Sequence, residues 1–65
     1  MPNDTLGAEL HVGDFVTTAE LNRYRIVRMD DDGDGFDFIV VSDMDGRERQ
    51  MLPALVLRSR RQSWE

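Results

Sequence analysis

The chain has 65 residues, no cysteine and a formal net charge of −5, from 13 acidic residues against eight arginines. This length allows one small domain, and the lack of cysteine excludes disulfides and thiolate metal sites. No apolar run approaches the ~20 residues of a membrane span. The acidic balance argues against indiscriminate binding to nucleic acid, because phosphates attract positive charge. We expect a soluble, cytoplasmic protein without cofactor or membrane contact.

The first third of the sequence predicts loops and one strand. Residues 1–8 lack periodicity, so we expect a disordered N-terminus there. A short strand between Leu10 and Val16 is approached through a tight turn at Gly13. Residues 17–28 allow either a helix with Thr17 as N-cap or a loop over 18–22 followed by a strand. The β-forming run from residue 24 to 29 favours the strand.

The remainder predicts strands at residues 24–29, 36–41, 47–52 and 55–58, separated by turns rich in Asp and Gly. Asp45-Gly46 is a strong hairpin signal, and Pro53 breaks the last ladder. Alternation from Leu55 predicts that Leu57 is in the core. Five short strands with tight turns predict an all-β fold, a five-stranded antiparallel barrel over residues 9–58. Residues 59–65 form an Arg- and Trp-containing tail.

The order of these features resembles the SH3-like barrels, nearest to Tudor-type domains. The resemblance rests on Val12-Gly13-Asp14-Phe15-Val16, on the hairpin at Asp45-Gly46-Arg47-Glu48, and on the break at Pro53-Ala54-Leu55 before a last strand. Tudor readers of methylated side chains use an aromatic cage. In this chain two cage positions fall on Val41 and Met44, so the resemblance does not imply a methyl-lysine or methyl-arginine reader.

The acidic segment resembles half of a calcium loop. Asp30-x-Asp32-x-Asp34-Gly35 places oxygen ligands and a glycine as such a loop requires, but position 12 is Val41 rather than a bidentate Glu. We therefore interpret it as a solvated turn and expect no bound metal. His11, the single histidine, and the serines show no nucleophile motif, so the sequence predicts no enzyme.

The composition favours a non-enzymatic protein-interaction module, either a regulatory subunit or a small inhibitor of a larger complex. A Tudor- or KOW-type nucleic-acid module using Arg47 and Arg49 with the tail, or an acidic nucleic-acid mimic, remains the alternative. In the tail, Trp64 either anchors a partner or folds back over the barrel end. The predicted partner-binding residues are Tyr24, Asp30, Asp31, Asp32, Asp34, Met44, Arg58, Arg60, Arg61 and Trp64.

Overall fold

The structure is a computed structural model that describes residues 2–31, 33 and 37–64. Its strands are β1 (Phe15–Thr18), β2 (Arg23–Asp31), β3 (Asp37–Ser42), β4 (Glu48–Met51) and β5 (Val56–Arg58). One 3-10 turn, η1 (Pro53–Leu55), precedes β5. The expected all-β class with five antiparallel strands and at most one short helical turn is therefore confirmed.

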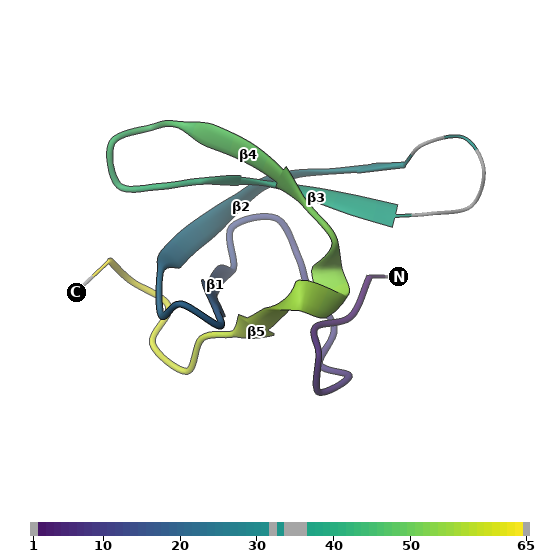
Figure 1. Cartoon of the computed structure of the whole chain (residues 1–65), viewed down its shortest axis with the longest axis horizontal. Helices are drawn as coiled ribbons and strands as arrows, with labels where there is room; N and C mark the ends of the chain where they lie inside the picture. Colours follow the sequence, from purple (N-terminus) through teal and green to yellow (C-terminus); the bar gives the residue numbers. More distant parts are fainter. Residues whose placement is uncertain (1, 32, 34–36, 65) are drawn as a thin grey trace.

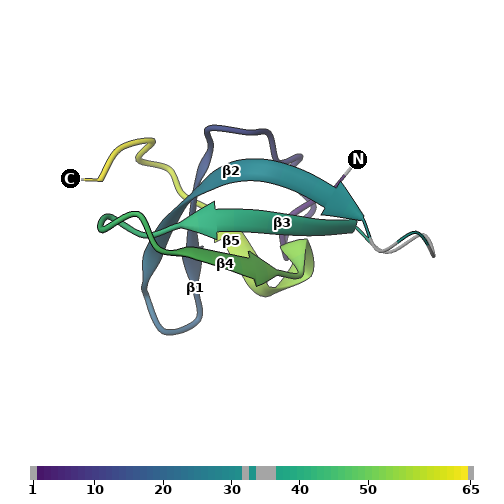
Figure 2. The same ribbon diagram turned by 90° about the horizontal axis from the view of Figure 1, so that it is seen from above.

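The five strands form one antiparallel sheet in the order β4-β3-β2-β1-β5. Figure 1 shows the long β2–β3 hairpin with β4 beside it, and Figure 2 shows β1 running across these strands. Among the described residues no pairing joins β4 to β5, so the sheet is not closed and the predicted barrel is not confirmed. The chain leaves β4 through Pro53, which has no amide donor to extend the ladder.

Strand β2 belongs to both halves of the sheet. Its first residues, 23–25, pair with β1, and residues 25–31 pair with β3. The register shifts between Ile26 and Arg28, which marks a β-bulge. Bulges bend a strand and increase its twist. The bulge therefore lets one strand serve two differently oriented parts of a small sheet.

The core follows the alternation of the strands. Its buried members come from both halves of the sheet and from the segment before β1: Leu10, Val16, Tyr24, Ile26, Ile39, Val41 and Val56. Val40 is also buried, on the opposite face of β3, so both faces of this strand are apolar toward its end. Phe36, where the predicted strand begins, lies outside the described residues.

The hairpin turns largely match the sequence signals. Asp45-Gly46 forms the β3–β4 turn, where Asp43 N–H donates to the Arg47 carbonyl over 3.0 Å and Gly46 has a φ of 88°. Between β1 and β2, the loop interpretation of residues 18–22 is confirmed over the helix. In that loop Thr18 N–H donates to the Asn22 carbonyl over 3.0 Å.

The prediction for Leu57 was wrong. Its side chain is 39% exposed, whereas the neighbouring Val56 is 1% exposed and belongs to the core. The error comes from Leu55, which lies in η1 rather than in a strand. Alternation therefore begins at Val56, so Val56 enters the core and Leu57 points away from it.

Candidate functional site

The N-terminal segment, predicted to be disordered, covers one edge of the sheet. Thr5 N–H donates to the Val56 carbonyl over 2.9 Å, and Asp4 Oδ2 accepts the backbone N–H of Arg58 over 2.7 Å. Asp4 is only 6% exposed, and its other carboxylate oxygen accepts the N–H groups of Leu6 and Ala8. Asp4 and Thr5 therefore have specific partners on β5, and they occupy the free edge of that strand.

Burial and hydrogen bonding act in opposite directions on Asp4. Burial alone raises its pKa, but the backbone hydrogen bonds from Arg58, Ala8 and Leu6 outweigh burial, so its pKa lies below the ordinary value of 3.8. Hydrogen bonds to the ionised form stabilise that form. Asp4 is thus held as a carboxylate, and its role here is structural.

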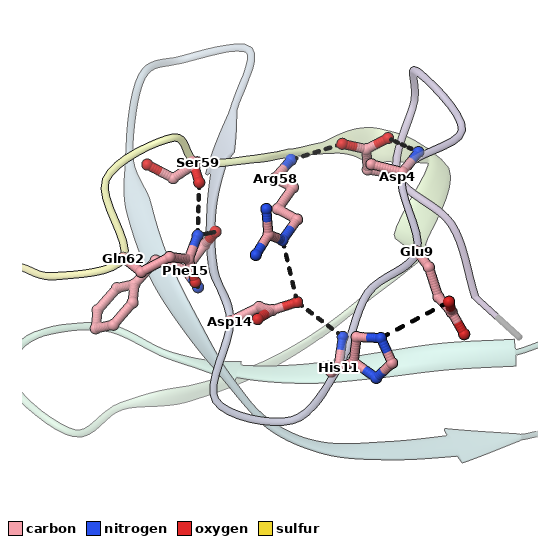
Figure 3. A network of polar contacts seen from close by, with 9 residues as sticks. Asp4, Glu9, His11, Asp14, Phe15, Arg58, Ser59 and Gln62 are labelled. Atoms are coloured by element: carbon pink, nitrogen blue, oxygen red, sulfur yellow. Dashed lines mark hydrogen bonds and ion pairs between the residues drawn. The ribbon is translucent and has the colours of Figure 1, made fainter.

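The Arg-Trp tail packs against the start of β1, as Figure 3 shows for its polar contacts. Gln62 Oε1 accepts the Phe15 N–H over 2.8 Å, and Ser59 N–H donates to the Phe15 carbonyl over 2.8 Å. The Trp64 ring meets the Phe15 ring edge-on, with centroids 4.9 Å apart. Of the two readings of Trp64, this geometry supports the one in which it folds back onto the sheet.

The basic residues of the tail are exposed, and Arg58 among them has an acidic partner. The Arg58 guanidinium lies 3.4 Å from Asp14 Oδ2, and Arg60 is exposed on the bend that follows. Arg61 is exposed too. Elsewhere Arg28 pairs with Glu48 over 3.6 Å. Of the arginines that the nucleic-acid alternative needs, Arg58 thus has an acidic neighbour that partly neutralises it.

The predicted acidic surface is only partly described. Asp30 is exposed near the end of β2, Asp31 ends that strand, and Asp32 and Asp34 lie outside the described residues. In the part of the chain that the structure describes, no three His, Cys, Asp or Glu side chains are grouped to hold a metal ion. The described part also has no helix long and apolar enough to span a bilayer.

A hollow that the sequence did not predict lies between the β1–β2 turn, β4 and η1. Its volume is about 550 Å³. Its walls include Thr18, Tyr24, Phe38, Arg49, Met51 and Leu55. We call it the Tyr24 groove. Met44, which was also predicted to bind a partner, does not line it; Met44 lies 69% exposed in the β3–β4 turn.

One wall of the groove is polar because β4 presents Arg49 toward the core side of the sheet. Arg49 pairs across the strands with the buried Val41, and Met51 pairs with the buried Ile39. Directly opposite residues share a face of the sheet. Arg49 Nη1 donates to the Tyr24 hydroxyl oxygen over 3.2 Å. Arg49 and Met51 are two residues apart in a predicted strand and therefore share a face. This spacing was the sequence signal that could have placed Arg49 on the core side of the sheet.

Exposed leucines surround the groove. Leu55 is 66% exposed and Leu52 is 43% exposed on its rim. Leu55 also lines a second hollow of about 460 Å³ together with Leu21 and Leu57. The two hollows share Thr18, Ala19 and Leu55, so their apolar walls are continuous. Large continuous apolar surfaces on small proteins mark interaction sites.

Comparison with protein-family models, curated proteins and solved structures gives no match for this chain. The candidate site therefore rests on its own geometry.

Proposed function

We propose that this chain is a non-enzymatic protein-interaction module that binds a segment of a larger protein in the Tyr24 groove. The observation that carries the proposal is the position of the groove beside an uncovered sheet edge. Strand β4 ends the sheet and pairs with β3 alone among the described strands, whereas the N-terminal segment covers β5. An extended segment can add to such an edge through backbone hydrogen bonds while its side chains enter an adjacent hollow.

The size and charge of the site favour a segment of another protein over a second copy of this chain. About 550 Å³ lies within the range of ligand pockets, roughly 300–1,000 Å³, and suits a few side chains rather than a broad flat interface. Two copies that each carry a net charge of −5 repel each other. The exposed Leu52 and Leu55 supply the apolar contact that binding requires.

The same features support two finer expectations from the sequence. The strand order and the 3-10 turn before the last strand are compatible with an SH3-like architecture, which we propose although the sheet is open between β4 and β5. We propose that the module acts in the cytoplasm as a regulatory subunit or small inhibitor, because the groove offers a binding surface and the sequence contains no nucleophile motif.

Affinity capture from the source cells tests the proposal, with nuclease-treated extract and with two variants as baits. Leu55→Asp places a charge on the groove rim. Leu6→Asp places the same charge on a leucine that is 79% exposed and away from the groove. The captured protein is then purified and titrated directly. We expect Leu55→Asp to weaken binding at least about tenfold and Leu6→Asp to leave it unchanged.

Three results would contradict the proposal. Capture that depends on nucleic acid supports the Tudor- or KOW-type alternative instead. Equal affinity of the two variants places the docking surface elsewhere. A dimer of this chain that Leu55→Asp dissociates, detected by sedimentation, makes a second copy the occupant of the groove.

A further inference from the structure

We infer that the Tyr24 groove selects a segment in which an acidic side chain lies next to an apolar one, with the carboxylate held by Tyr24 and Arg49. This inference rests on the proposed function and specifies the partner's chemistry. Tyr24 is 6% exposed, and its hydroxyl is fixed in place because its ring belongs to the core. The polar end of the groove is thus part of a rigid element.

The hydrogen bonding of this pair leaves donors available to a ligand. Arg49 gives one Nη1 hydrogen bond to the Tyr24 oxygen, and no carboxylate of the described residues lies within 4.0 Å of its guanidinium. A guanidinium has five N–H donors and no acceptor, and a phenol has one O–H to donate. The Tyr24 hydroxyl accepts from Arg49, so its own proton points elsewhere. The two groups together form a convergent set of donors.

Carboxylate is the protein group that matches this donor set. Arginine forms short, charge-assisted hydrogen bonds to carboxylates, and its planar fork fits two oxygens at once. The surrounding side chains of Phe38, Met51 and Leu55 are apolar and offer contact to an apolar neighbour of the ligand carboxylate. A ligand with only an apolar side chain at this position would leave the N–H groups of Arg49 and the O–H of Tyr24 without an acceptor, which is unfavourable.

One acidic group also lines the groove. Glu20 contributes from the β1–β2 turn, where Asn22 Nδ2 donates to its Oε2 over 3.4 Å. Glu20 forms no ion pair with Arg49. The groove therefore has an anionic and a cationic position, and a ligand carboxylate is attracted to the Arg49 position and repelled from the other.

We infer that the carboxylate of the bound segment belongs to an acidic side chain and not to a C-terminus. Glu20 from the β1–β2 turn and Leu52 after β4 line the groove together with Arg49, and β4 pairs with no described strand other than β3. A segment that adds to the β4 edge as an extended strand continues past Arg49 in both directions.

Three peptide probes separate these possibilities. The first is Gly-Leu-Glu-Leu-Gly with both ends blocked, the second is its Gln counterpart, and the third is the Gln peptide with a free C-terminal carboxylate. Each is titrated into the full-length, isotope-labelled chain at constant ionic strength, and amide and arginine side-chain NMR signals are followed. We expect the Glu peptide to bind roughly fivefold more tightly than either Gln peptide.

Variants locate the effect. Arg49→Gln and Tyr24→Phe should each abolish the preference for the Glu peptide, and Glu20→Gln should strengthen binding of that peptide. Arg60→Gln is the matched control, because it removes the same charge from an exposed position outside the groove. The Arg60→Gln variant should keep the preference for the Glu peptide over the Gln peptides.

The outcomes distinguish this inference from the function on which it rests. Equal binding of the Glu and blocked Gln peptides, with shifts at Tyr24, overturns the carboxylate preference but leaves the groove as a docking site. Tighter binding of the free-terminus peptide overturns the choice of an acidic side chain. An equal loss in Arg60→Gln and Arg49→Gln shows only a general charge effect and overturns the inference. Failure of all three peptides to bind also overturns it, while the capture experiment with Leu55→Asp decides the proposed function separately.

Discussion

Asp4 and Arg58 lie 54 residues apart in the chain and are joined by a 2.7 Å hydrogen bond from the Arg58 backbone N–H to Asp4 Oδ2. This contact connects the N-terminal segment to the last strand. It also distinguishes the two sheet edges, because the β5 edge is covered whereas β4 pairs with no described strand other than β3.

Asp4→Ala should destabilise the domain by about 2–3 kcal/mol. The substitution removes the acceptor of three backbone N–H groups and leaves them without that partner in a mostly buried position. Denaturant unfolding measures the change. The control is Glu9→Ala at an exposed carboxylate, which should alter the stability by less than about 0.5 kcal/mol. An Asp4→Ala chain as stable as the control would show that the N-terminal segment does not hold the edge.

The lowered pKa of Asp4 predicts a loss of stability in acid. The folded-state pKa lies below the ordinary value, so the unfolded chain takes up a proton first as the pH falls. The stabilisation by this carboxylate is complete above about pH 5 and declines as the pH falls through 3.8 and below. Asp4→Asn should flatten this part of the pH profile of unfolding. Identical profiles for the two chains would contradict the assignment.

Leu21→Asn should stabilise the fold and weaken partner binding. Leu21 has a φ of 66° and an 86% exposed side chain. A bulky residue is strained in this left-handed region, whereas Asn tolerates it, so we expect a gain of about 0.5–1 kcal/mol. Leu21→Ala, which keeps the strain, should give no such gain. Affinity for the partner should fall in both variants, because Leu21 lines the hollow next to the Tyr24 groove. Unchanged affinity would exclude this leucine from the docking surface.

Trp64→Ala should destabilise the domain by about 1–2 kcal/mol, since its ring packs edge-on against Phe15, which is itself nearly buried. For a domain of this size the melting temperature should fall by roughly 4–16 °C. Arg60→Ala, at an exposed neighbouring position, is the control and should melt with the unmodified chain. A Trp64→Ala chain that melts normally but loses its partner would restore Trp64 as a binding anchor.

The sequence predicted the local structure better than the long-range contacts. The Asp45-Gly46 hairpin and β3 follow from turn chemistry and alternation, which are properties of neighbouring residues. Asp4 and Gln62 could not be identified in this way, because their partners on β5 and β1 lie 54 and 47 residues away. Both are polar residues in segments without hydrophobic periodicity. Such a pattern indicates a loop, and it does not show whether that loop packs against the sheet.

The candidate site shows the same division. Tyr24 was predicted as a partner-binding residue; it lies in the core and contributes its hydroxyl to the groove. Leu52 and Leu55 were assigned to strands. They lie at the start and end of η1 instead, and a strand alternation pattern does not reveal which side chains such a turn exposes. The acidic segment gave the strongest composition signal, and its partner-binding role stays a prediction.

Backbone NMR of the labelled chain, free and saturated with its captured partner, tests the central claim most directly. We predict that the largest shifts and the strongest gain in amide protection occur at residues 18–20, at Tyr24 and along residues 49–55, with the tail little affected. Shifts confined to residues 58–64 or to the acidic residues 30–37, with the groove unchanged, would contradict the claim that the Tyr24 groove is the docking site.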